Sequence, residues 1–507
     1  MEAQGSELLS FLSVGEAMPQ RPWPRHRLTR RQWERLILHL TVADWPLLAL
    51  WGEAQAVHVA LYEAASRTVA VASLECPDGR FPSLSAVRPG AIRLERAVQD
   101  LFGLVAEGLS DPRAWLDHGQ WPAPHPAGLA RQTAQPRPAT QYAFLTVAGD
   151  GLHQIPVGPV HAGIIEPGAF RFHCAGETVA RLEERFGYAH KGIEALMAGK
   201  PAGAAARLAG RLSGDSTVAC SLAFARAVEA ATGTGIPPRA VYLRALMAEL
   251  ERIANHLGDV GAICNDAAFG FMLAHFSLLR EDVLRAAQSC FGHRLMMDSV
   301  IPGGVARDLD AEGQTRLGVL MERLAARLAE LVAVYDDKPS LLDRTVGTGI
   351  LSAALARRFA AGGYIGRASG RDFDARRDPG YPPYEDLDFA VPVLTEGDVN
   401  SRLLIRVREI EASLGLVRQI LDRLPVGAID TAVESGGGEG LALVEGFRGD
   451  YLAWVSLGAN GAIRRAHLRD PSWLQWPLLE AAIEGNIVAD FPLCNKSFNC
   501  SYSGADL

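Results

Sequence analysis

Two serines spaced three residues apart stand where a metal-binding site would be expected to carry thiols. Ser213 and Ser216 lie in "RLSGDSTVACSLAFARAVE", beside a glycine and before a run of helical composition. Cysteines at this spacing would clamp a soft metal ion, because such metals bind thiolates. A serine hydroxyl has a pKa far above neutrality and does not replace a thiolate. The segment therefore has the frame of a CxxC metal site without its ligands.

Size and composition limit what the chain can be. Its 507 residues exceed one ordinary hydrophobic core, so at least two domains are expected. Hydrophobic residues make up 48% and charged residues 21%, which is typical of a globular protein. The net charge of -8 gives no reason to expect nucleic acid as a partner. The seven cysteines form no CxxC pair, which favours a reducing compartment, and no segment reads as a membrane span.

The first part of the sequence predicts a small domain with a β-hairpin. Apolar residues alternate over 57–61 and again over 69–71, on either side of the turn-like "EAASR". Prolines crowd 122–138, where they exclude helix and favour extended chain. The expected organisation is a domain at 1–120, a proline-rich linker at 121–140 and a second domain at 141–507.

The second part predicts long helices. Apolar residues recur at steps of three and four in three segments, which are Leu246 to Val260, Leu317 to Leu331 and Leu403 to Leu421. Three long amphipathic helices favour a bundle. The stretch 445–470 alternates and contains "GANG", which predicts a β insertion. The fold class is therefore α+β, with a small α/β domain followed by a mainly helical bundle that has β insertions.

Several long segments resemble one protein family. They are "GPVHAGIIEPGAFRFHCAGETVARLEERFGYAHKGIEALMAGK", "RALMAELERIANHLGDVGAICNDAAF", "GHRLMMDSVIPGGVARD", "GRASGRDFDARRD" and "DFAVPVLTEGDVNSRLLIRVREIEASL". They resemble, in order, the large subunits of membrane-bound, formate-hydrogenlyase-type NiFe-hydrogenases and their relative, the 49 kDa-type subunit of NADH-quinone oxidoreductase (respiratory complex I). The first domain resembles the 30 kDa-type subunit of that complex through "ERAVQDLFG". The fold expected from this resemblance is a fusion of a 30 kDa-like domain with a 49 kDa-like domain.

The resemblance implies that the metal site of the hydrogenase branch is degenerate here. The family's two CxxC motifs fall on Ser213 and Ser216, and on Ser501 and Gly504. We therefore expect no metal or other cofactor on this chain, and no nickel–iron centre. Cys220 takes the place of a family histidine. The alternatives for Cys220 are to bind a metal or form a redox pair with Cys500 across the site and, as for most buried cysteines, to act as a small apolar residue.

Other family positions give candidates for proton transfer and for the lining of the cavity. Glu166 matches a glutamate that transfers protons in the hydrogenase branch, and His161 lies nearby in the sequence; the alternatives are a hydrogen-bonded carboxylate and a structural histidine. The quinone-binding tyrosine of the 49 kDa-type subunit falls on Gly214, and its histidine falls near Glu166 or Ile165. The family also places the loop 366–378 beside the cavity, which makes candidates of Arg367, Asp372 and Asp374, although these charges also suit a salt-bridge network.

The function implied by the resemblance is that of a peripheral oxidoreductase-complex subunit on the cytoplasmic face of the inner membrane. Its expected partners are an iron–sulfur subunit, which would carry the clusters, and antiporter-like and other integral membrane subunits. Electron transfer in such NAD- or quinone-linked complexes is coupled to ion translocation. Three alternatives stay open: a quinone-type oxidoreductase subunit with altered headgroup contacts, a non-redox coupling scaffold and an assembly factor.

Overall fold

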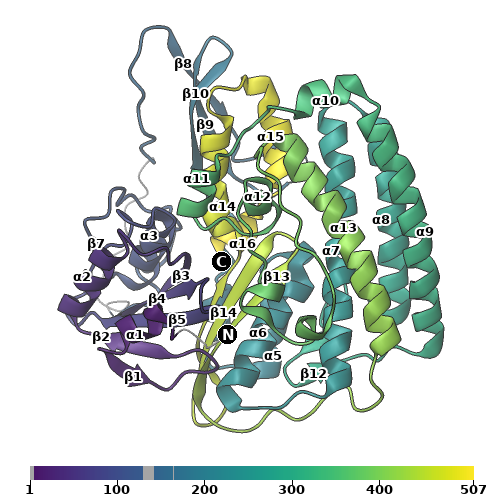
Figure 1. The fold of residues 1–507 in the computed structure, drawn as a ribbon. Coiled ribbons are helices and arrows are strands. Elements are labelled where there is room, and N and C mark those ends of the chain that lie inside the picture. The colour runs from purple at the N-terminus through teal and green to yellow at the C-terminus, as the bar shows by residue number, and fades with distance from the viewer. Residues whose placement is uncertain (1–4, 130–141, 164) are drawn as a thin grey trace.

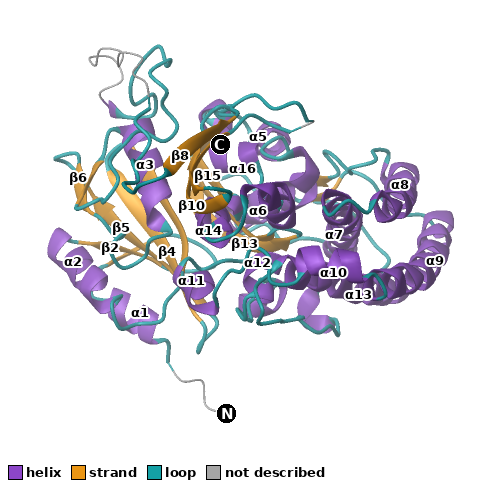
Figure 2. Cartoon of the chain, turned by 90° about the horizontal axis from the view of Figure 1, so that it is seen from above, coloured by secondary structure: helices purple, strands orange, loops and turns teal. Residues whose placement is uncertain are grey.

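The computed structural model describes residues 5–129, 142–163 and 165–507. A β-rich N-terminal part lies beside a helical part, and a narrow sheet projects between them at one end (Figure 1). Seen from above, the strands of both parts gather on one side and the long helices on the other (Figure 2). No helix in the described ranges is both long enough and apolar enough to cross a bilayer.

The N-terminal part is a five-stranded sheet covered by helices. The strand order is β1 (Glu16–Met18), β2 (Arg25–Leu28), β5 (Thr68–Glu75), β4 (Ala56–Glu63) and β3 (Leu47–Glu53). Strands β4 and β5 form the predicted hairpin, with Val59 opposite Ala72. Three helices and two short paired strands complete this part: α1 (Glu7–Leu12), α2 (Arg30–His39), α3 (Ala91–Phe102), β6 (Arg80–Pro82) and β7 (Val105–Glu107).

Only part of the expected linker can be described. Its beginning runs along the end of α3, where Ala127 N–H donates to the Leu101 carbonyl at 2.9 Å. Residues 130–140 lie outside the described part of the chain. The boundaries at 120 and 140 therefore stay a prediction.

Two further three-stranded sheets belong to the second part. The projecting sheet has the order β10 (Thr178–Arg185), β9 (Ala169–Ala175) and β8 (Leu152–Val157). The other consists of β13 (Gly438–Gly446), β14 (Gly449–Leu457) and β15 (Ile463–Arg469), all antiparallel. This sheet is the β insertion expected at 445–470, extended by one more strand at its start.

The sheet β13–β15 is covered on both faces, so every residue of β14 is buried. On one face, β13 and β14 pack against the N-terminal sheet, and the Trp51 and Trp454 rings lie 5.7 Å apart between their centroids. On the other face lies α6 (Thr217–Thr232). Gly440 permits this close approach, because a Cβ there would clash with the Ala227 carbonyl oxygen. The sheet thereby fixes the position of α6 and of the turn that precedes it.

The helical part is a bundle of four long helices: α7 (Pro238–Asp266), α8 (Gly270–Phe291), α9 (Ala311–Asp336) and α13 (Val399–Arg423). The predicted helices correspond to α7, α9 and α13, and their leucine stripes form one core. Shorter elements surround the bundle: α4 (Ile193–Met197), α5 (Ala202–Ala209), β11 (Val300–Ile301), β12 (Gly304–Val305), α10 (Pro339–Thr345), α11 (Ala353–Arg358), α12 (Gly363–Ala368), α14 (Ser472–Ile483), α15 (Phe491–Phe498) and α16 (Tyr502–Asp506).

Candidate functional site

The structure brings together the four positions expected to lack metal ligands. Ser213 precedes the short helical turn η2 (Gly214–Ser216), Ser216 ends it before α6, and Ser501 caps α16, where its hydroxyl accepts from Gly504 N–H at 2.9 Å. The hydroxyls of Ser213 and Ser501 lie 2.8 Å apart, across 288 positions of sequence. We call Ser213, Ser216 and Ser501 the serine centre. Its two loops are joined by a hydrogen bond between hydroxyls.

Arg448 holds the serine centre together. It comes from the turn between β13 and β14 and is 3% exposed. Its guanidinium donates to Asp215 at 2.8 and 2.6 Å, to the Ser216 hydroxyl at 2.9 Å and to the Asn499 carbonyl at 2.6 Å. One arginine therefore bonds to both loops of the centre. We did not predict it from sequence, because a single arginine in "GFRGD" carries no motif.

The fourth position, Gly504, lies against a buried carboxyl. A Cβ at Gly504 would stand 2.5 Å from Oδ2 of Asp470, which is closer than real Cβ contacts allow. Asp470 is fully buried, and Oδ2 has no hydrogen-bond partner among the described residues. A side chain at position 504, including a cysteine, would have to displace Asp470. Sequence reasoning missed this residue because it lies 34 positions before Gly504.

Three carboxyls with different electrostatics surround Cys220. Burial alone would raise the pKa of Asp215, but Arg448 and the serine hydroxyls lower that pKa to about 2. Burial raises the pKa of Asp470, and it raises the pKa of Glu251 to about 8. The thiol of Cys220 is buried as well, and the nearby carboxyls of Asp470, Glu251 and Asp215 raise its pKa further above the ordinary value. The surroundings of the serine centre are therefore rich in acid groups with divergent pKa values.

The cysteines give no sign of metal or redox chemistry at this site. Cys220 and Cys500 are both free and buried. Burial raises the pKa of each thiol well above the ordinary value, so both are protonated at neutral pH. Within the described ranges, no group of three or more His, Cys, Asp or Glu side chains is arranged to hold a metal ion.

Glu166 and His161 lie on the segment that leads into β9. Glu166 is exposed, where we expected a partly dry cavity, and its carboxylate accepts from Ser503 N–H at 2.9 Å. That bond ties the segment to α16, next to Gly504. His161 Nε2 bonds to the Gly168 carbonyl at 2.8 Å, which matches the structural alternative. A proton-transfer role for either residue stays a prediction.

Gly214 and the loop 366–378 lie in different surroundings. Gly214 is exposed at η2. Arg367 is fully buried, away from solvent, and bonds to Glu409 at 2.8 Å and Glu445 at 2.9 Å. Asp374 is also buried and lies 3.4 Å from Arg367. Asp372 instead stays exposed and pairs with Arg377. The salt-bridge network is therefore present, whereas cavity lining by these three residues stays a prediction.

Two family models match the sequence. The 49 kDa subunit of respiratory-chain NADH dehydrogenase matches residues 267–435, and its 30 kDa subunit matches residues 27–131. The chain is 31% identical to formate hydrogenlyase subunit 5 of Escherichia coli K12, over 84% of this chain and 77% of that protein. It is also 31% identical to hydrogenase-4 component G of the same organism, over 89% of this chain and 81% of the relative.

An NADH-quinone oxidoreductase subunit and one solved complex are similar as well. The oxidoreductase subunit, from Roseiflexus sp. RS-1, is 33% identical, over 66% of this chain and 94% of that protein. Among solved structures, a chain of the membrane-bound sulfane sulfur reductase, an archaeal respiratory membrane complex, superposes with a TM-score of 0.67 and 25% identity. The match covers 71% of this chain and all of that chain.

Proposed function

We propose a function from one premise: the chain belongs to the family of large subunits shared by energy-converting hydrogenases and NADH-quinone oxidoreductases. Its function in our proposal is that of a peripheral subunit in a membrane-associated oxidoreductase complex. The complex couples electron transfer to ion translocation, and this chain lies on the cytoplasmic face of the inner membrane. The names of the relatives support an oxidoreductase complex, and that of the solved neighbour supports association with a membrane. Ion coupling and the cytoplasmic face come from the family resemblance alone.

The residues at the serine centre do not fit the nickel–iron centre of the hydrogenase branch. Hydroxyls stand at three of the four ligand positions, and those of Ser213 and Ser501 bond to each other at 2.8 Å. At the fourth, Asp470 stands where the side chain would be. Soft metals need thiolate ligands, which this site lacks. We therefore propose that the chain carries no cofactor of its own and that iron–sulfur clusters lie in a partner subunit.

The hydrogen bond between Ser213 and Ser501 is the observation that carries this proposal. It closes the two loops on each other, and Arg448 reinforces the closure through Asp215 and Asn499. The chain's own residues can therefore hold the loops in a fixed arrangement without a metal. Ionisable carboxyls, those of Asp215, Glu251 and Asp470, lie around the centre, which supports a role in proton chemistry.

Native purification of the complex through a tag on this chain tests the proposal. We expect an iron–sulfur subunit and integral membrane subunits to co-purify from solubilised membranes, identified by mass spectrometry. Isolation of the chain alone, or with metal-insertion proteins, would contradict the proposal and favour an assembly factor. A complex without iron–sulfur clusters would point to a coupling scaffold. A complex that reduces quinone would support the alternative of a quinone-type oxidoreductase subunit with altered headgroup contacts.

A further inference from the structure

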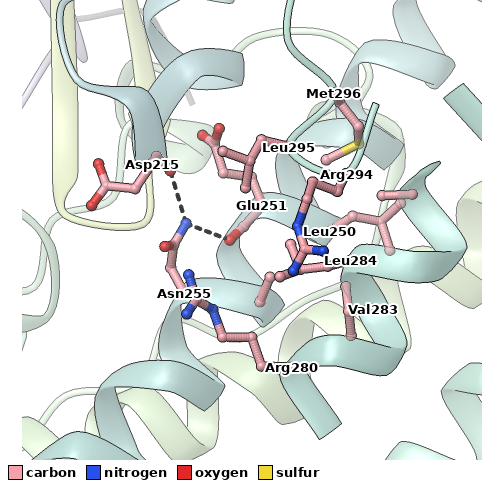
Figure 3. Close-up of a pocket in the computed structure, with 12 residues that line it drawn as sticks. Asp215, Leu250, Glu251, Asn255, Arg280, Val283, Leu284, Arg294, Leu295 and Met296 are labelled. Atoms are coloured by element: carbon pink, nitrogen blue, oxygen red, sulfur yellow. Dashed lines mark hydrogen bonds between the residues drawn. The ribbon is translucent and has the colours of Figure 1, made fainter. Parts of the chain in front are cut away.

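A small pocket leads from the surface between α7 and α8 toward the serine centre. Apolar side chains of both helices form its walls, including Leu250, Val283 and Leu284. Its free space of about 10 Å³ is close to what one water molecule needs. Arg280 and Arg294 project into it, and at its inner end lie Glu251, Asn255 and the backbone of Asp215 (Figure 3).

Asn255 connects this pocket to the turn of the serine centre. Its side-chain N–H groups donate to the carbonyls of Asp215 and Glu251, each at 2.9 Å (Figure 3). Asp215 in turn bonds to Ser213 through its carboxylate, at 2.8 Å. The turn at Asp215 is therefore in contact with both the pocket and the serine centre.

Glu251 is the buried acid between them. Its side-chain oxygens accept the N–H groups of Val218 at 2.7 Å and Ala219 at 3.0 Å, in the first turn of α6. It also lines the pocket, although the residue itself is only 6% exposed. The residue therefore lines the pocket, while its carboxylate lies against the first turn of α6, which follows Ser216.

The charges around Glu251 come from every neighbouring element. Asp215 lies on η2, paired with Arg448, and Cys220 lies on α6. Arg252 is its neighbour on α7, and Arg280 of α8 and Arg294 of the loop after α8 line the same pocket. Beyond Cys220 lies Asp470 with its unpaired, buried oxygen. Of the three carboxyls around the serine centre, those of Asp215, Glu251 and Asp470, the one on Asp215 forms an ion pair with Arg448.

We propose that Glu251 is a proton-binding site behind the serine centre, in exchange with solvent through this pocket. Its carboxylate takes up a proton from water in the pocket, forming one O–H bond, and returns the proton by the same route. No electron moves, and bulk buffer is the donor and acceptor. The proposal rests on the proposed function, because it identifies proton binding as the chemistry that the metal-free centre retains.

The pKa of Glu251 agrees with this geometry. Burial raises that pKa to about 8, whereas the two backbone N–H donors oppose the shift. A carboxyl of this kind gains and loses its proton near neutral pH, which is where efficient proton exchange requires it to titrate. Glu95 offers a matched comparison: it is fully buried, bonds to Ser83 and Leu84, and has a pKa raised to about 7, yet it does not line this pocket.

Infrared difference spectroscopy of the natively purified complex, titrated from pH 6 to 10, tests the proposal. We expect a carbonyl band of a protonated carboxyl that disappears with a midpoint near the pKa of Glu251, and that Glu251→Gln removes. Glu95→Gln should remove a different band and leave this one in place. A titrating band that is unchanged in Glu251→Gln would overturn the proposal.

A second variant tests the pocket and does not depend on Glu251→Gln folding. Ala287 is a buried pocket residue on α8, and Ala287→Val should partly fill the space. After transfer to D₂O, we expect the Glu251 band to shift several-fold more slowly in Ala287→Val than in wild type, with the same pH midpoint. An unchanged exchange rate would contradict exchange through this pocket. Neither readout depends on the nickel content of the complex. A negative result here would therefore leave the proposed function untouched, and the reverse also holds.

Discussion

The carboxyls around the serine centre and a second polar cluster both include a glutamate of helix α7, but the two regions differ in how their charges are paired. The second cluster, which we call the ionic seam, joins α7 to α13 and β13; it consists of Glu249, Arg252, Arg367, Asp374, Arg376, Glu409 and Glu445. Four carboxyls there face three guanidiniums, and each arginine contacts at least two acids. Around the serine centre, three carboxyls lie near Cys220, and among the arginines of the described ranges only Arg448 forms an ion pair with one of them, Asp215.

This difference separates a structural role from a chemical one. In the seam each arginine contacts at least two acids, so the cluster fixes the helices. The arginines lower the pKa values of Glu249, Asp374 and Glu409, whereas burial and the charge of Asp374 raise the pKa of Glu445 to about 7. In the serine centre, Asp470 keeps an unpaired oxygen, and burial raises the pKa of both Asp470 and Glu251. With a pKa of about 8, Glu251 changes protonation close to the physiological range. The comparison predicts that the seam governs stability and that the centre governs the response to pH.

Breaking the seam should have the largest effect on stability. Arg367→Ala removes the partner of Glu409, Glu445 and Asp374 and leaves buried charge uncompensated. We expect a loss of about 3–5 kcal/mol in the free energy of unfolding, measured by chemical denaturation. The control is Arg285→Ala, which breaks an exposed pair with Glu281 on α8 and should cost no more than about 1 kcal/mol. Equal losses in the two variants would show that the buried pairs of the seam contribute no more to stability than an exposed pair does.

Restoring a ligand-type side chain at position 504 should destabilise the chain. Gly504→Cys places its Cβ against Asp470, and overpacking of this kind costs about 1–3 kcal/mol. In an Asp470→Ala background the added cost of Gly504→Cys should be smaller, which a double-mutant cycle of unfolding free energies measures. Identical costs in the two backgrounds would show that Asp470 does not occupy this space.

Glu251 should make the centre more stable at lower pH. Its pKa in the folded chain is about 8, above the unfolded value of about 4.3, so the folded state holds more protons between these values. Stability from this group is complete below the unfolded pKa and falls as pH rises toward 8, by at most about 1.4 kcal/mol per pH unit. Unfolding free energies from pH 5 to 9 should show a flatter slope in Glu251→Gln; parallel slopes would contradict this.

The smallest effect is expected from the bond between the two loops. Ser213→Ala removes the hydroxyl that bonds to Ser501 and Asp215, which should cost about 1 kcal/mol. Melting temperature against wild type is a sufficient readout. Ser13→Ala, at an exposed hydroxyl, should change it little and serves as the control. No difference between the two variants would mean that the bond adds nothing to the closure of the loops.

Sequence periodicity was sufficient to predict the long helices and the hairpin, but not to predict which residues surround the site. The leucine stripes of α7, α9 and α13 and the hairpin β4–β5 are local patterns, so they could be predicted. Burial of all of β14 could not, because it depends on the N-terminal sheet packing on one of its faces. Arg448 and Asp470 reach the site from the ends of strands. The alternation of apolar and polar residues in those strands does not predict which residues these two side chains contact. The serine positions were accessible only through family resemblance.

The most direct test of the account is the metal content of the complex, purified natively through a tag on this chain. We predict iron, from clusters in a partner subunit, and no nickel above background, because hydroxyls and Asp470 stand where thiolates would be required. Nickel in stoichiometric amount with this chain would contradict the central claim that its serine centre works without a metal.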